Sequence, residues 1–259
     1  MKASLLIAMA IAAPLIGQTP CEDNQNRGDR NRGHCEMREY TIANAGRLDV
    51  DSSLNGGIRI TGEDRSNVLV RAKVQGRSDS VESAKAMVAM VRVEATPGHV
   101  RASGPQNLQD ASWSVSYEIL VPRRTALILK AHNGGINIAD VEGDIQFQTL
   151  NGGVNLKRLA GDVRGKTQNG GVQVELAGNT WHGSQLDVQT TNGGVQVSVP
   201  QNYSARFESS TVNGKVQADF PGVQVEKGKT DRNVSLTLGS GGPLVRIVTT
   251  NGGIQLRKS

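Results

Sequence analysis

The sequence predicts an all-β protein, a single-chain parallel β-solenoid with one short inserted helix near residues 79–90. Two observations predict this fold. The dipeptide Asn-Gly recurs seven times, followed by Gly or Lys and then by Ile or Val, and the residues around it alternate between apolar and polar. The composition fits a thin interior with many tight corners, because only 3% of the 259 residues are aromatic and 31 are glycines.

Each repeat has its corner at an asparagine. The seven corners begin at Asn55, Asn133, Asn151, Asn169, Asn192, Asn213 and Asn251. From Asn133 onward the steps between neighbours are 18, 18, 23, 21 and 38 residues. Because the last step is about twice the others, we expect a degenerate copy at residues 231–236. We also expect the last coil to form an exposed end of the stack, blunted by its charges or stacked on another molecule.

Short strands flank each corner. The residues three and five positions after the asparagine are apolar, as in Val154 and Leu156, and positions minus six, minus four and minus two repeat the alternation, as in Ile145, Phe147 and Thr149. A hairpin would also place Asn-Gly between two strands, but the constant period and parity favour stacked coils. In such a stack we expect the asparagine amides to bond one another, the threonines to point inward and the glycines to allow positive φ.

The region before the regular repeats is less periodic. It contains candidate strands at residues 47–51, 57–61, 67–74, 91–95 and 112–121. Asp79 with Glu82 three residues later resembles a capping box, and apolar residues follow at helical spacing. We expect one short helix there, covering an open end of the stack.

The N-terminus has the layout of a secretory signal peptide over residues 1–17. Met1-Lys2 precedes an apolar run that ends at Gly17, is too short to span a bilayer and permits cleavage after Ala12 or Gly17. We therefore expect an exported chain with a polar leader at 18–39 and a β-solenoid domain at 40–259.

The two cysteines, Cys21 and Cys35, are predicted to form one disulfide in the leader, because the chain is exported and they lie 14 positions apart. The alternative is two free thiols. Lipidation of Cys21 is disfavoured because Gln18, Thr19 and Pro20 precede it, where a lipoprotein signal has small residues.

The search for chemistry yields one pair of acidic residues. Asp144 and Asp162 lie 18 positions apart and could stack, with Lys157, Arg158, Arg164 and Lys166 nearby, which is the minimum for a polysaccharide lyase or hydrolase. Each Asp follows a Gly, however, where it is an ordinary turn residue. We therefore favour a chain that is not an enzyme and keep the polysaccharide-active enzyme as the alternative.

No cofactor, metal or nucleic acid is expected. His34, His99, His132 and His182 show no paired spacing. The formal charge of +5 comes from 29 basic and 24 acidic residues that are interspersed rather than gathered into a stripe.

These features together resemble a known bacterial family. The signal peptide, the opening strands, the Val121-Pro122 step and the repeated run Thr149-Leu150-Asn151-Gly152-Gly153-Val154 resemble the adhesin-like domain of unknown function called the toastrack domain, over roughly residue 40 to the C-terminus. The resemblance implies a right-handed solenoid in exported or envelope proteins, with a role in adhesion or envelope sensing and no agreed catalytic residues. The expected partner is an envelope, glycan or protein ligand bound on an outer face, or a second copy stacked end to end.

Overall fold

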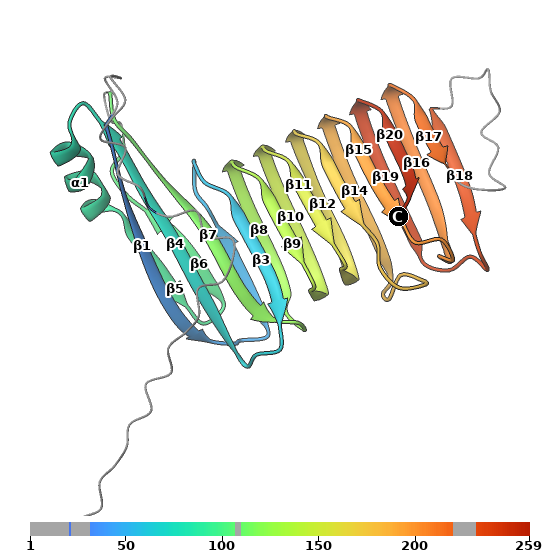
Figure 1. Ribbon diagram of the computed structural model, residues 1–259, viewed down its shortest axis with the longest axis horizontal. Helices are drawn as coiled ribbons and strands as arrows, with labels where there is room; N and C mark the ends of the chain where they lie inside the picture. The colour runs from blue at the N-terminus through green and yellow to red at the C-terminus, as the bar shows by residue number, and fades with distance from the viewer. Residues whose placement is uncertain (1–20, 22–31, 107–109, 220–231) are drawn as a thin grey trace, which may run out of the picture.

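The structure, a computed structural model, describes residues 21, 32–106, 110–219 and 232–259. The predicted signal peptide and its cleavage positions lie outside these residues, as does much of the predicted leader. The described chain forms an elongated body with helix α1 near one end and strands β17 and β18 at the other (Figure 1).

The strands form two ten-stranded sheets. Sheet I runs in the order β1 (Arg32–Ala43), β4 (Asn67–Ser78), β7 (Ser112–Pro122), β3 (Ile58–Glu63), β9 (Ile136–Ala139), β11 (Val154–Lys157), β13 (Val172–Glu175), β15 (Val195–Val199), β20 (Ile254–Lys258) and β17 (Val216–Asp219). Sheet II runs in the order β18 (Asn233–Leu238), β16 (Ala205–Asn213), β19 (Leu244–Asn251), β14 (Gln185–Asn192), β12 (Ala160–Asn169), β10 (Glu142–Asn151), β8 (Ala126–Asn133), β2 (Arg47–Asp51), β6 (His99–Ser103) and β5 (Arg92–Thr96). The prediction of an all-β protein is confirmed.

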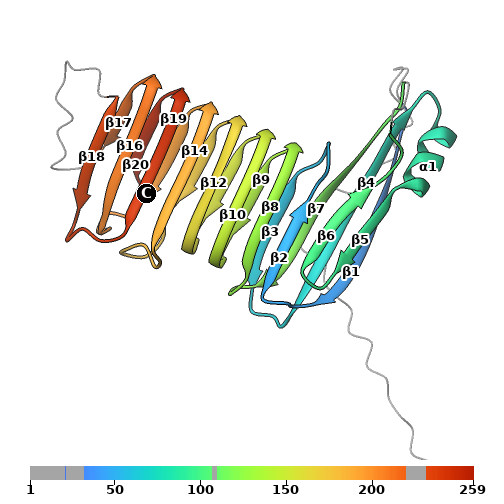
Figure 2. The same cartoon turned by 180° about the vertical axis from the view of Figure 1, so that it is seen from behind.

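Each regular coil gives one strand to each sheet. The chain passes from β10 in sheet II through the Asn151 corner to β11 in sheet I and then to β12 in sheet II. Like residues are partners in parallel register: Asn151 aligns with Asn133 and Asn169. Figure 2 shows β8, β10, β12 and β14 side by side in sheet II.

The core lies between the two sheets and consists of the inward residues of both. Along the strands, buried positions alternate with more exposed ones; in β9 and β11 every buried residue is followed by a half-buried one, and the inward residues are mostly Val, Ile and Leu. One inward position is Gly165, where a Cβ would overlap the ring of the neighbouring Phe147. A large and a small residue therefore share one layer of the core.

The N-terminal part extends both sheets. Strand β2 occupies the predicted residues, and β3, β4, β5 and β7 lie close to their predicted ranges. Strands β1 and β6 were not predicted. Because β1 begins at Arg32, the domain boundary predicted at residue 40 falls inside a strand. Strands β1, β4 and β7 pair antiparallel, unlike the coils that follow.

The predicted helix is present as α1 (Val81–Met90). Its N-cap is Ser80, whose side chain accepts from the backbone N–H of Ser83, so the prediction of a cap at Asp79 is wrong by one residue. The helix lies at the N-terminal end of the body (Figure 1). It packs on Gly76 of β4, where a Cβ would lie 2.7 Å from the carbonyl oxygen of Ala84.

The C-terminal coil is not at the end of the stack, so that prediction is wrong. Strands β19 and β20 insert between the coil of β14 and β15 and the coil of β16 and β17. The predicted degenerate copy at 231–236 is also wrong, because Asn233–Leu238 forms β18, which pairs antiparallel with β16. The long step from Asn213 to Asn251 thus contains an edge strand, after which the chain returns into the stack.

Candidate functional site

The corner asparagines form a hydrogen-bonded ladder along the whole stack. The spatial order of the corners is Asn55, Asn133, Asn151, Asn169, Asn192, Asn251 and Asn213, and each amide Nδ2 after that of Asn55 donates to the Oδ1 of the preceding corner at 2.6–3.0 Å. The inserted coil therefore continues the ladder. These amides use their polar groups on one another, which makes the ladder a structural element.

A second column lies inside the corner. Thr167 donates to the carbonyl oxygen of Gly152 at 2.9 Å, and four other threonines make the equivalent bond at 2.8–2.9 Å. The members, Thr149, Thr167, Thr190, Thr211 and Thr249, are all buried. The prediction that these threonines point inward is confirmed.

The first glycine of each corner is required by close packing between coils. A Cβ on Gly170 would overlap the carbonyl oxygen of Gly152, and Gly152 stands in the same relation to Gly134. Among the first glycines, only Gly56 and Gly252 have φ in the left-handed range, at 141° and 157°. The expectation that these corners need positive φ is therefore wrong for most of them.

The second glycine of four corners lies open on the outer face of sheet I, whereas at Gly57 and Gly135 a Cβ would approach a neighbouring carbonyl oxygen to 3.1 and 3.0 Å. At Gly153, Gly171, Gly194 and Gly253 a Cβ would approach no atom closer than 3.4–3.5 Å, which is ordinary van der Waals contact. The corner at Asn213 carries Lys215 at this position, so the fold accepts a side chain there.

These glycines form the floor of a groove of about 850 Å³, which we call the glycine trough. Its floor is Gly135, Gly153, Gly171, Gly194 and Gly253. Lys215 takes the equivalent position beside β17, the sixth strand of the series β9, β11, β13, β15, β20 and β17. Six strands at about 4.8 Å spacing give a length of about 24 Å between the outer two strands.

A row of amide side chains borders the trough. The residues four positions after each corner asparagine are in register on neighbouring strands and are Asn137, Asn155, Gln173, Gln196, Gln255 and Gln217. Of the residues that the structure describes, only Arg257 bonds to this amide row, by donating to the Gln255 side chain at 2.6 Å. The other five amides are available to a ligand.

Charges lie beyond the amide row and are largely paired. Arg158 donates to Asp140 at 2.7 and 2.8 Å and to Glu175 at 3.2 Å, and Lys157 lies 3.8 Å from Glu175. The hydrogen bond from Arg158 holds the pKa of Asp140 below its usual range. The lining of the trough contains one charged side chain, Lys215 at one end, and Arg257 reaches the amide row from outside this lining.

The outer face of sheet II carries more charged side chains than the trough on sheet I. A hollow of about 470 Å³ on the outside of sheet II is lined by Lys130, Arg164, Lys166 and Asp187 among glutamines. Its acidic group is paired, since Arg246 donates to Asp187 at 3.0 and 3.1 Å.

The predicted acidic pair is adjacent but is not poised for proton transfer. Asp144 and Asp162 are partners in register on β10 and β12, as expected for stacked positions. Burial raises the pKa of Asp162, but the hydrogen bonds from Ser184 and Arg164 outweigh it and leave this pKa lowered. A general acid needs a raised pKa.

The basic residues predicted near that pair divide between the sheets. Arg164 and Lys166 lie on β12 of sheet II, beside Asp162, whereas Lys157 and Arg158 lie at the end of β11 in sheet I. The described residues contain no group of three or more His, Cys, Asp or Glu placed to hold a metal ion.

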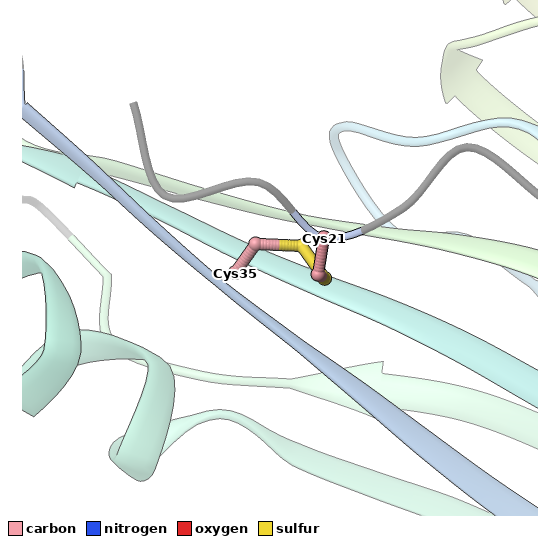
Figure 3. Close-up of a disulfide and its surroundings, with 2 residues drawn as sticks. All are labelled: Cys21 and Cys35. Carbon is pink, nitrogen blue, oxygen red and sulfur yellow. A yellow bond between two sulfur atoms is a disulfide. The ribbon is translucent and has the colours of Figure 1, made fainter. Parts of the chain in front are cut away.

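Cys21 and Cys35 are joined by a disulfide bond (Figure 3). Their Cα atoms lie 5.4 Å apart. Cys35 lies in β1, where it pairs with Gln75 of β4, so the bond fastens residue 21 to the edge of sheet I.

The geometry defines a class: an all-β protein of two sheets built from repeated coils, with a polar trough along one face. Several solved structures are similar to it. A candidate cell adhesion protein from Clostridium sporogenes is 12% identical, with a TM-score of 0.48 over 87% of this chain and 100% of the other. Candidate adhesins from Bacteroides fragilis (10% identity, TM-score 0.31, 87% and 97%) and Parabacteroides distasonis (11%, 0.36, 86% and 97%) are also similar.

The sequence itself places the chain in a family. Residues 125–257, just over half of the chain, match the Toastrack DUF4097 family model, and the chain belongs to this family. No curated protein matches the chain. Within the described residues, no helix is long and apolar enough to cross a membrane.

The amide row was missed by sequence reasoning, although its signal was present. An Asn or Gln stands four residues after six of the seven corner asparagines, and Arg59 stands after the seventh. Only the strand register shows that these amides share one face with the second glycines.

Proposed function

We propose that this chain is an exported, non-catalytic binding module of adhesin type, acting in the periplasm, at the cell surface or outside the cell, and that its ligand lies along the glycine trough. The observation that carries the proposal is the row of six amides in register beside a floor of glycines. Membership of the Toastrack family and the signal-like N-terminus support it.

The proposal includes the organisation of the chain. Residues 1–17 are the signal peptide, the residues from 18 up to β1 are a leader that Cys21 fastens to Cys35 of β1, and the remainder, from β1 onward, is the binding domain. The coils wind with a right hand, as the family resemblance implies. A crystal structure with left-handed coils would overturn that part alone.

A binding role is favoured over catalysis because the trough lacks the groups that catalysis needs. Hydrolysis or elimination on a polysaccharide uses convergent carboxylates or a carboxylate with a base. The amide row has no carboxylate, and two acidic groups beyond it, Asp140 and Glu175, are paired with Arg158. Amides and glycine backbone can hold a ligand without transferring a proton.

The test uses the secreted chain and a variant that fills the trough. Gly171→Gln adds an uncharged side chain at the centre of the floor, where a Cβ meets no atom closer than 3.4 Å and where Lys215 shows that the fold accepts a long side chain. The double variant Gln146→Ala/Gln148→Ala removes outward amides from β10 of sheet II and serves as the control.

Each protein is sedimented with envelope fragments of the producing cells and of neighbouring bacteria. We expect the wild type and the sheet II control to co-sediment and Gly171→Gln to lose at least tenfold in affinity, with unchanged melting temperature. Equal binding by Gly171→Gln, or release of sugar fragments from a polysaccharide by the wild type, would overturn the proposal, the second outcome in favour of the enzyme.

A further inference from the structure

We infer that the ligand of the glycine trough is a linear, uncharged glycan that lies across the strands, with one sugar residue over each strand. This inference rests on the function proposed above and names its ligand. It follows from the chemistry of the trough, its repeat distance and its ends.

The chemistry excludes other polymers. A nucleic acid or an acidic polysaccharide needs cations along its length, whereas the amide row from Asn137 to Gln217 contains none. A peptide strand binds a sheet at an open edge, through unpaired backbone groups. The trough instead lies on a sheet face, where the ladder already uses the backbone groups of β11, β13 and β15. A lipid chain needs apolar walls, whereas the apolar residues of this lining, Val154, Val172, Val195 and Ile254, are buried and the side chains that border the floor are amides.

A polymer that carries hydroxyl groups fits the uncharged amide row and the glycine floor. A side-chain amide offers one carbonyl acceptor and two N–H donors, so each Asn or Gln can bond two hydroxyls of a sugar. The glycine floor is flat and exposes Cα–H groups, against which the apolar face of a pyranose ring can lie. With only 3% aromatic residues in the chain, affinity comes from repeated hydrogen bonds rather than from ring stacking.

The repeat distance also fits. Neighbouring amides lie one strand spacing apart, about 4.8 Å, which is close to the advance of one hexose in an extended chain. Six strands carry the row, so the trough holds about six sugars in the same register as its amides.

The ends of the trough are defined by charged residues. At one end Lys215 replaces the glycine of the floor, and at the other Asn137 is followed in register by Arg59 on β3. Arg59 in turn pairs in register with Glu118 of β7. The uncharged site is therefore of finite length, so affinity should increase with chain length and then level off.

The experiment measures affinity against chain length by isothermal titration. The probes are neutral homo-oligosaccharides of glucose, mannose and N-acetylglucosamine with two to eight residues, and polygalacturonate is the acidic comparison. For the series that fits, we expect about a fivefold gain in affinity per added sugar, the value of about one net hydrogen bond, up to about six sugars and no gain beyond.

Three variants make the result specific to the trough. Gln173→Ala/Gln196→Ala should lose at least tenfold, and the control Gln146→Ala/Gln148→Ala on sheet II should lose nothing. Lys215→Gly clears the floor beside β17, the last strand of sheet I, and should strengthen the binding of a six-residue oligosaccharide without moving the plateau. Melting temperatures of all variants are measured alongside, so that a folding defect is recognised.

The outcomes separate the inference from the proposed function. If no neutral series binds, or if polygalacturonate binds and Gly171→Gln abolishes its binding, the ligand is not a neutral glycan. Trough-dependent binding to envelope fragments would then still support the proposed function. If envelope binding is also absent or insensitive to Gly171→Gln, both are overturned. Affinity that is independent of chain length would refute the arrangement of one sugar per strand.

Discussion

The corner glycines allow a sharp test, because two adjacent glycines have opposite surroundings. In Gly170→Ala the new methyl overlaps the carbonyl oxygen of Gly152 and lies 2.9 Å from the backbone nitrogen of Gly153. Backbone atoms cannot move aside without separating two coils. That separation strains the bonds from Thr167 to Gly152 and from Asn169 to Asn151.

The expected cost follows from these contacts. Overpacking costs about 1–3 kcal/mol and two weakened hydrogen bonds about 1 kcal/mol each, so we expect Gly170→Ala to lose about 3–5 kcal/mol. For a chain of this size the melting temperature should fall by about 10 °C.

The control is Gly171→Ala, one residue away. Its methyl meets only the carbonyl oxygen of Gly194, at 3.4 Å, and should leave the stability unchanged or raise it by up to about 1 kcal/mol. Thermal and urea unfolding followed by circular dichroism measure both. Equal melting temperatures for the two variants would refute the close-packing account of the first glycine.

Three further outcomes are expected. Gly165→Ala should cost about 1–3 kcal/mol by overlap with the Phe147 ring, and adding Phe147→Leu should recover most of that loss in a double-mutant cycle; additive losses would contradict the contact. Removal of residues 244–259 takes four fully buried apolar side chains out of the interior of the stack. Their burial contributes about 6–12 kcal/mol to the free energy of unfolding, so cooperative unfolding should disappear. Removal of the last two residues alone should preserve it. Arg158→Gln should cost under about 1 kcal/mol at pH 7, because the ion pair with Asp140 is partly exposed. Since the pKa of Asp140 is lowered in the folded state, this stabilisation is present above the unfolded pKa of about 3.9 and is lost as the pH falls through the lower folded pKa. The free energies of unfolding of wild type and variant should therefore converge in acid, and a constant difference between them would refute the assignment.

The coil architecture could be predicted from the sequence because the apolar residues around each corner asparagine are buried only if equivalent residues of neighbouring coils stack on one another. The alternation around Asn151 gives the inward faces of both strands, and its 18-residue distance to Asn169 gives the register. The order of the coils could not be predicted. Every coil from Asn151 onward presents the same Asn and Thr columns and a Val or Ile three residues after the Asn, so the Asn251 coil fits between Asn192 and Asn213 as well as it would fit at the end.

The missed strands and the glycine error have physical causes too. Strand β1 carries polar residues on much of its length, because it is an edge strand with a single partner. Its pattern therefore lacks the alternation of a central strand. The role of Gly170 was attributed to φ, since sequence reasoning sees a corner and not the corner stacked beneath it.

The second glycine of four corners remains to be explained, and the fold does not explain it. Gly153, Gly171, Gly194 and Gly253 lie outside the left-handed range, have room for a Cβ, and are replaced by Lys215 in one coil. Glycine within or beside strands lowers the stability of the folded state by about 0.5–1 kcal/mol relative to alanine. Four such glycines in a row on an open face therefore weaken the sheet, and no packing contact in the fold requires them. A side chain at any of them would stand in the trough. Access of a ligand to the amide row accounts for their size, where packing does not.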